Sequence, residues 1–353
     1  MLRKLRPWWI ILTRVGPVAN LARQADQLFR YYVLETLAEE GLFEYLKEPR
    51  SYEEILNRFG YIDSRFARDL LTILVKDKEN ILVLDGDRYR MNPARPLPRL
   101  EDITGGTNPR VHSFGEMAKG IARFIPARLR NEPVEFPETF EEEDRQLLTK
   151  FDKSLGNRTY TAVRDTAFGL LSATDWRMIH GGKLLDIGSG SGRETAEIWA
   201  KFGGDIHITA IDPVASMLEL ANRRFPETLD EIAPGHPPLT DANRPEFVTA
   251  SALELPFPDE TFDAAFHSLV LHWTADPVQA IKEIVRVLKP GGIVFGTQAT
   301  KPRMNPYFDI VIRANEDTYG FFWQEEFVRW YADCGVQLEI TTPLGTFRGQ
   351  KPG

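Results

Sequence analysis

A run of glycines after an apolar segment is the clearest sign of chemistry in this sequence. Residues 184–194 read LLDIGSGSGRE, with Gly188, Gly190 and Gly192 at alternate positions. Glycine has no Cβ, so the backbone of such a turn can approach a ligand closely, and a helix that starts there offers free N–H groups. The pattern predicts a strand, a turn and a helix that bind a nucleotide-like cofactor, with Asp186 as a fixed negative charge.

The spacing of these glycines narrows the choice of cofactor. The dinucleotide fingerprint G-x-G-x-x-G needs a third glycine at the position of Arg193, whereas the spacing here is G-x-G-x-G. Asp212 closes the apolar run 206–211, twenty residues beyond Gly192. A second strand would deliver its carboxylate to ribose hydroxyls. This acid suits NAD and S-adenosylmethionine equally.

Two histidines follow another expected strand. Residues 263–273 read DAAFHSLVLHW, which places His267 and His272 at or just past the strand's carboxyl end, where open α/β sheets bind ligands. Histidine titrates near neutral pH and is the usual general base. We predict His272 as the base for an acceptor molecule, with His267 as a second candidate. A purely structural histidine is the alternative for both.

Motifs further along the chain separate the cofactors. Residues 255–263 read LPFPDETFD and residues 281–292 read IKEIVRVLKPGG, each beside an apolar strand. Over roughly residues 180–300 the chain resembles the class I S-adenosylmethionine-dependent methyltransferases. This resemblance implies an α/β, Rossmann-like fold with a seven-stranded, mostly parallel sheet. It also implies S-adenosylmethionine as cofactor. A nucleotide-free α/β domain with a glycine-rich turn is the alternative.

The resemblance also assigns roles to residues around the cofactor. Asp186 would lie near the ammonium of the cofactor, and Asp212 would accept hydrogen bonds from both ribose hydroxyls. In related families an acid after the third strand accepts the adenine amino group, but this chain has Ser251 there, a weaker acceptor without charge. Besides these residues and the three glycines, we predict cofactor contacts at Pro213, Met217, Ala252, Leu253 and His267.

The acceptor half of the site is less defined. Plant-type O-methyltransferases remove the phenolic proton with a histidine in a His-Asp-Trp-Ser-Asp context, which residues 272–276 (HWTAD) match in part. The acid that those enzymes place after the fifth strand is not evident in residues 296–298, which read GTQ. We expect methylation of a hydroxyl on a small apolar or aromatic molecule, with carbon methylation of a quinone, carotenoid or tetrapyrrole-like molecule as the alternative. An aromatic acceptor pocket could be lined by Trp273, Tyr307, Phe321, Phe322 and Trp323.

The remaining sequence predicts further elements. A helix from Gln27, a capping box at Ser51, a third helix capped by Asp63 and a hairpin around Asp85-Gly86 together indicate a winged helix. From residue 181 we expect strands at 183–187, 206–211, 246–249, 262–267 and 292–297, with helices at 192–202, 214–225 and 277–288. Residues 226–245, with five prolines, should form an exposed loop.

A chain of 353 residues is long enough for two domains. We predict a basic aromatic segment at 1–25, a winged-helix-like domain at 26–100 that is all-helical apart from its hairpin, a helical linker or lid at 101–180, and the cofactor-binding catalytic domain at 181–353. In the small-molecule O-methyltransferases that this order resembles, the N-terminal domain serves dimerisation. We therefore expect a homodimer with a small-molecule acceptor.

Binding of nucleic acid is not expected. The third helix carries Arg65, Arg68 and Lys76 against Asp63 and Asp69, whereas duplex binding requires a basic stripe. A winged-helix regulator whose methyltransferase-like domain only senses a cofactor is the rival function. It would retain DNA and show no turnover.

The first 25 residues differ from the rest in charge. They hold five basic residues and no acid, whereas the chain as a whole has a net charge of −8. Residues 8–12 (WWIIL) are far too short to span a membrane. They could lie on an anionic membrane surface or pack across a dimer partner. The single Cys334 excludes a disulfide framework and a cysteine zinc site, so we expect a cytoplasmic protein without a metal, with association with a membrane as the alternative.

Overall fold

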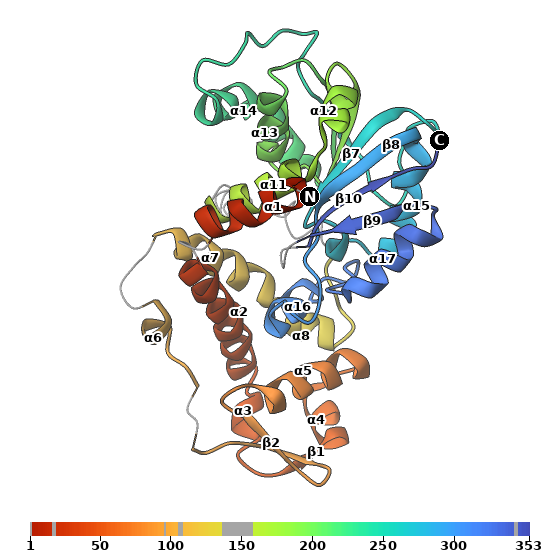
Figure 1. Ribbon diagram of the computed structural model, residues 1–353. Coiled ribbons are helices and arrows are strands. Elements are labelled where there is room, and N and C mark those ends of the chain that lie inside the picture. The colour runs from red at the N-terminus through yellow and green to blue at the C-terminus, as the bar shows by residue number, and fades with distance from the viewer. Residues whose placement is uncertain (1, 16–18, 95–96, 105–108, 136–157, 342–344) are drawn as a thin grey trace. The chain divides into compact units, whose positions relative to one another are not determined.

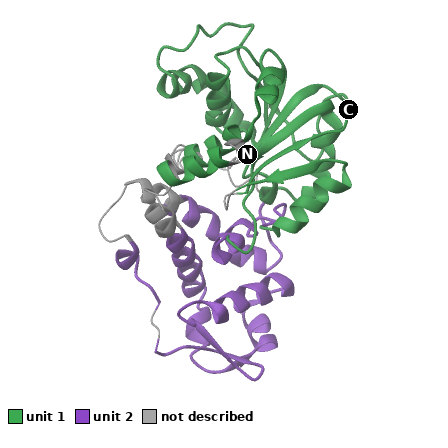
Figure 2. Cartoon of the chain, viewed as in Figure 1, with its two compact units in different colours: residues 1–19, 140–303, 321–353 green, residues 20–139, 304–320 purple. Residues whose placement is uncertain are grey.

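The chain forms two compact units, shown in different colours in Figure 2. The structure, a computed structural model, describes residues 2–15, 19–94, 97–104, 109–135, 158–341 and 345–353. Unit 1 consists of Met1–Ala19, Phe140–Arg303 and Phe321–Gly353, and unit 2 consists of Asn20–Thr139 and Met304–Gly320. Each unit is therefore built from separate stretches of the chain.

Unit 1 is built around a seven-stranded sheet with the order β6-β5-β4-β7-β8-β10-β9 (Figure 1). Strands β4 to β8 pair in parallel, and β10 runs antiparallel to both of its neighbours. The strands are β4 (Lys183–Ile187), β5 (His207–Asp212), β6 (Glu246–Thr249), β7 (Phe262–Ser268), β8 (Leu288–Thr297), β9 (Gln337–Ile340) and β10 (Thr346–Gln350). The predicted Rossmann-like, mostly parallel sheet is confirmed.

Helices cover both faces of this sheet (Figure 1). Successive side chains of a strand point to opposite faces, so Leu184 belongs to the core under helices α11, α13 and α14, while Leu185 belongs to the core under α15 and α17. The helices of unit 1 are α1 (Leu2–Ile10), the π-helix η1 (Ile11–Val15), α11 (Arg158–Leu170), α12 (Ala173–Ile179), α13 (Arg193–Lys201), α14 (Ala215–Ile232), the 3-10 helix η3 (Leu271–Trp273), α15 (Pro277–Val287) and α17 (Gln324–Asp333).

All eight elements predicted for residues 183–297 are present, but two boundaries differ by more than one residue. Strand β8 begins at Leu288, four residues earlier than predicted and directly after α15. Helix α14 continues through Pro226 to Ile232, although residues 226–245 were predicted as a loop. Phe225 and Leu229 are buried on the same helix face, so core packing extends the helix past the proline. The irregular segment begins at Ala233.

Unit 2 combines helices with a small antiparallel sheet. The predicted hairpin forms β2 (Leu82–Asp85) and β3 (Arg88–Met91), and a further short strand, β1 (Arg50–Ser51), pairs with β3. The region is thus not all-helical, although its elements are compatible with a winged helix. The helices of unit 2 are α2 (Ala19–Glu39), α3 (Leu42–Tyr45), α4 (Tyr52–Phe59), α5 (Ser64–Lys76), α6 (Leu100–Thr104), α7 (Pro109–Ala122), α8 (Ile125–Leu129) and α16 (Pro306–Ile312).

Side-chain caps and a buried ion pair stabilise unit 2. The Ser51 capping box and the Asp63 cap are both present, as predicted. Arg30 on α2 donates to Asp77 at 2.7 Å, and Tyr307 on α16 donates to the same carboxylate at 2.6 Å. These bonds join helix α2 to the distant segment 304–320. No helix among the described residues is both long and apolar enough to cross a membrane.

Candidate cofactor and acceptor site

The predicted site residues gather at the carboxyl edge of the parallel strands. Strand β4 lies between β5 and β7, so the chain order reverses there, and open α/β sheets bind ligands at such a point. The glycine turn follows β4, Asp212 ends β5, His272 follows β7, and Gln298 follows β8. Four consecutive strands of the sheet therefore contribute to one edge.

The glycine turn adopts a backbone conformation that other residues rarely adopt. Gly188, Gly190 and Gly192 have φ values of 68°, 53° and 79°. A Cβ on Gly188 would lie 2.6 Å from a methyl carbon of Val270, and a Cβ on Gly192 would lie 2.9 Å from that of Ala221. Both glycines are required by close packing as well as by conformation.

Asp186 lies buried at the end of β4 with half of its carboxylate free. Its Oδ2 accepts a hydrogen bond of 2.7 Å from the Thr195 hydroxyl, while its Oδ1 has no partner among the described residues. Ser189 Oγ in the turn and Glu194 Oε2 are also buried and unpartnered there. Burial raises the pKa of Asp186 to about 7. A cationic, hydrogen-bonding group such as the ammonium of S-adenosylmethionine fits these acceptors.

Asp212 accepts hydrogen bonds from two backbone N–H groups. Its Oδ2 accepts from Gly190 at 3.0 Å and its Oδ1 from Val214 at 2.9 Å. Burial raises its pKa to about 6, although these two bonds lower it in part. Each carboxylate oxygen has a second lone pair, so both can still accept from ribose hydroxyls. The hydrogen-bond acceptors at the glycine turn and at the end of β5 thus fit the ammonium and the ribose of the cofactor.

A buried arginine, which the sequence did not reveal, balances the acids beside the turn. Arg164 on α11 donates to Glu197 at 2.6 and 2.8 Å and contacts Glu194 at 3.3 Å. Burial raises the pKa of Glu194 to about 8, with Arg164 opposing that shift. Burial also acts to raise the pKa of Glu197, but Arg164 outweighs it and lowers that pKa. A cation held by helix α11 therefore supports the acidic side of the cofactor site.

The other predicted cofactor residues lie after β5 and β6. Met217 is buried on α14 and Ala252 is also buried, whereas Pro213 and Ser251 are exposed and Leu253 is partly buried. Ser251 Oγ accepts from the Leu253 N–H at 3.2 Å, so its oxygen retains one acceptor position. Their cofactor contacts stay predictions.

His272 is held by an amide from the next strand. It lies on the 3-10 helix η3 with 2% exposure, and the Gln298 side-chain nitrogen is 3.1 Å from its Nδ1. The same nitrogen is 3.0 Å from the carbonyl oxygen of Ala299. An amide oxygen in that place would face another oxygen, which favours the orientation with the NH2 group there. In this orientation Gln298 donates to Nδ1, which assigns the proton of the neutral imidazole to Nε2.

Gln298 occupies the place beside His272 where related O-methyltransferases have an acid. No acid follows the fifth strand, as noted from the sequence, but a glutamine takes the place beside the histidine. A carboxylate would accept from Nδ1–H and leave Nε2 as a base, whereas the amide leaves Nε2–H as a donor. Burial lowers the pKa of His272 to about 3, so the ring is neutral near pH 7.

His267 lies in the core instead of the site. It is fully buried, its Nε2 is 2.9 Å from the Tyr331 hydroxyl, and its ring is 4.7 Å from that of Phe347. Burial lowers its pKa to about 3. It faces the core under α15 and α17, as Leu185 does, so we do not retain it as a base or as a cofactor contact. The sequence held one sign of this position. Residues two apart in a strand point to the same face, and Ala265, two residues before His267, also lies in this core.

Only two of the five predicted acceptor aromatics accompany His272. The ring of Phe321 lies 4.6 Å from its imidazole and that of Trp273 lies 5.5 Å away. Phe322 packs in the core against Trp330, and Trp323 is half-exposed before α17. The fifth, the α16 tyrosine bonded to Asp77, belongs to unit 2. Within the described part of the chain, no group of three or more His, Cys, Asp or Glu residues could hold a metal ion.

Comparison with known proteins agrees with this geometry. Residues 185–296 match the family described as "Methyltransferase domain". The demethylmenaquinone methyltransferase of Clavibacter sepedonicus is 33% identical over 124 residues, covering 35% of this chain and 44% of the relative. The malonyl-[acyl-carrier protein] O-methyltransferase of Halorhodospira halophila is 30% identical over 159 residues, covering 44% and 48%. The chain thus spans less than half the length of these curated relatives.

A solved structure resembles nearly the whole chain. The CurJ carbon methyltransferase has a TM-score of 0.65 at 16% identity, covering 98% of this chain and 99% of its own. At that identity the similarity concerns the fold. Together with the glycine turn, Asp212 and the sheet order, these matches identify a class I S-adenosylmethionine-dependent methyltransferase domain, and S-adenosylmethionine is its cofactor.

Proposed function

We propose that the chain methylates a carbon atom of a small acceptor that carries an oxygen next to the reacting carbon, as in an enol or a hydroxylated ring. The observation that carries this proposal is the Gln298 hydrogen bond to His272 Nδ1, which leaves a proton on Nε2. A base must have a free lone pair, whereas an oxygen-binding group must have a proton. His272 has the second arrangement.

The chemistry then divides between cofactor and protein. Bound S-adenosylmethionine supplies a methyl group on a cationic sulfur, ready for a nucleophile. The Nε2–H of His272 donates to the acceptor oxygen and stabilises the negative charge that makes the neighbouring carbon nucleophilic. Phe321 and Trp273 offer flat apolar surfaces beside this donor. The acceptor binds as its enolate or phenolate, having already lost its acidic proton to solvent. The carbon then bonds to the methyl group as the donor's carbon–sulfur bond breaks, and on an aromatic ring the methylated carbon finally loses its own proton to solvent.

The solved structures fit both carbon and oxygen transfer. A carbon methyltransferase resembles 98% of this chain, and two O-methyltransferase family proteins resemble 95% and 96% of it, so the fold is consistent with the proposal without selecting it. The partial His-Trp match and the O-methyltransferase relative keep hydroxyl methylation, our expectation from the sequence, as the second candidate. Methylation of a phenol would require the Gln298 amide to turn over and free Nε2.

The direct test is product structure. The purified chain is incubated with S-adenosylmethionine carrying a 13C-methyl group, together with a 1,3-diketone or a phenol of similar size. We expect a methyl group on carbon, identified by its 13C chemical shift. A methyl group on oxygen as the main product would overturn the proposal.

A variant tests the protonation of the histidine, first without an acceptor and then in the methylation assay. In 15N-histidine-labelled protein, we expect His272 to carry its proton on Nε2, as read from its nitrogen chemical shifts. Gln298→Glu should move the proton to Nδ1, lower carbon methylation by about tenfold and favour phenols. Gln337→Glu, at an exposed position at the start of strand β9, is the matched control. A wild-type ring with its proton on Nδ1 would contradict the assigned role.

A further inference from the structure

Helix α1 and the start of η1 expose an apolar face. Leu5, Trp8, Trp9 and Leu12 are 54%, 44%, 69% and 70% exposed. Their spacing of three, four and seven residues from Leu5 places them on one side of a helix. They make up half of the large hydrophobic side chains that the structure describes as exposed, within eight residues of sequence. We call these four residues the α1 apolar face.

The opposite side of α1 is fixed to unit 1. Pro7 is buried, and the side chain of Ile10 reaches within 3.3 Å of the Cβ position of Gly169 on α11. A larger side chain at Gly169 would collide with α1. The contact orients the helix, so the α1 apolar face points outward in a defined direction.

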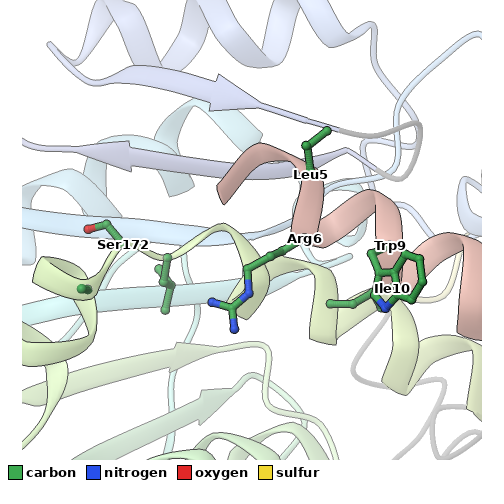
Figure 3. Close-up of a pocket in the computed structure, with 7 residues that line it drawn as sticks. Leu5, Arg6, Trp9, Ile10 and Ser172 are labelled. Atoms are coloured by element: carbon green, nitrogen blue, oxygen red, sulfur yellow. The ribbon is translucent and has the colours of Figure 1, made fainter. Parts of the chain in front are cut away.

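A hollow of about 820 Å³ lies beside this face. Its apolar lining comes from Leu5, Trp9, Ile10, Leu171 and Ala173, and its polar lining from Arg6 and Ser172. Figure 3 shows Leu5, Arg6, Trp9 and Ile10 on one helix and Ser172 on the neighbouring segment. An apolar hollow with one guanidinium group fits an acyl chain that carries an anionic head group.

The charge of the segment indicates the partner. Residues 1–15 hold four basic residues and no acid, so with a net charge of −8 for the chain, residues 16–353 carry −12. A symmetric contact with a second copy would bring two such basic segments together. An anionic lipid surface attracts the segment, accepts tryptophan at the head-group level and buries leucine.

We infer that the α1 apolar face and its flanking basic residues bind the chain peripherally to anionic membranes. The helix lies in the plane of the surface, with Trp8, Trp9 and Leu12 inserted and Arg6 near the phosphates. Unit 1 is thereby held at the bilayer, where apolar acceptors dissolve. The inference is independent of the acceptor atom and of His272.

Sedimentation with vesicles tests this inference on the full chain. We expect binding to phosphatidylcholine vesicles in which about a third of the lipid is phosphatidylglycerol, with weak binding to pure phosphatidylcholine and loss of binding at high salt. A blue shift of tryptophan fluorescence should accompany binding. Equal binding to both vesicles, or none to either, would overturn the inference.

Matched variants locate the contact. Trp9→Ala combined with Leu12→Ala should weaken binding at least about tenfold, as should Arg6→Glu at an exposed position. Trp323→Ala combined with Ile62→Ala removes two hydrophobic residues elsewhere that are 50% and 69% exposed, and this variant should bind as wild type does. Unchanged binding of both α1 variants would contradict the inference. A wild-type dimer that the double α1 variant converts to monomer, without vesicle binding, would instead assign this face to a second copy.

Discussion

The glycine turn and the His272–Gln298 pair lie at the same edge of one sheet, yet they are built differently. The turn holds its ligand site through the backbone of five consecutive residues. The pair joins side chains 26 residues apart, from segments that follow two neighbouring strands. The difference teaches that the donor half of this site is a local property of the chain, whereas the acceptor half depends on the sheet to bring its parts together.

The largest effect should come from the turn. Gly188→Ala places a Cβ 2.6 Å from Val270 in a backbone with φ of 68°. The strain and overlap should raise the Kd for S-adenosylmethionine on the order of 100- to 1000-fold, measured by calorimetry. Gly235→Ala has φ of 79° but open space around it, so it isolates the strain and should leave the Kd unchanged. Normal cofactor binding by Gly188→Ala would contradict the claim that the backbone of this turn forms the cofactor site.

The two histidines should separate activity from stability. His272→Ala should lower kcat about 100-fold because the donor to the acceptor oxygen is lost, while the Kd for the cofactor stays within about twofold. His267→Ala should lower the free energy of unfolding by about 1 to 3 kcal/mol because the Tyr331 hydroxyl loses its buried partner. Steady-state kinetics and urea unfolding measure the two effects. Full kcat in His272→Ala would refute its role.

Asp212 should have a smaller effect on cofactor binding. Asp212→Asn keeps the size of the side chain but turns a donor group toward the N–H of Gly190 or Val214. The Kd should rise about 10- to 100-fold, the loss expected for hydrogen bonds to a charged group. Asp259→Asn, on an exposed carboxylate paired with Arg286, is the control. Equal Kd values for both variants would exclude the ribose contact.

The smallest effect concerns pH. Asp186 and Glu194 have folded pKa values of about 7 and 8, above their unfolded values, so the folded state binds more protons than the unfolded state up to those pH values. Stability should therefore fall as the pH rises from about 4 to 8, with a loss of about 2 to 3 kcal/mol between pH 6.5 and 8.5. Both buried histidines are neutral throughout this window.

Thermal melting at several pH values measures this slope. Glu194→Gln should flatten it, and bound S-adenosylmethionine should reduce it by neutralising the acids. A slope of opposite sign would show that Arg164 outweighs burial at this site.

The sequence predicted the sheet, the glycine turn and Asp212 because their evidence is contiguous. Apolar strands, alternate glycines and an acid at a strand end are each read within a dozen residues. The contact between Gln298 and His272 could not be predicted in this way. In the sequence, Gln298 only marked a position where related enzymes have an acid. The sequence ranked His272 above His267 as a base but placed both beside the site, and the pleat of β7 and the 3-10 turn after it separate them.

The division of the chain into units has a consequence for how the protein is made. Residues 304–320 complete unit 2, and strand β10 (346–350) inserts between β8 and β9 of unit 1. On the ribosome, neither unit can acquire its final structure until these late segments emerge. Cutting the chain between residues 139 and 140 would leave the first piece without residues 304–320 of unit 2. The second piece would lack residues 1–19 of unit 1. A fragment that is meant to fold as unit 2 should therefore be supplied together with residues 304–320.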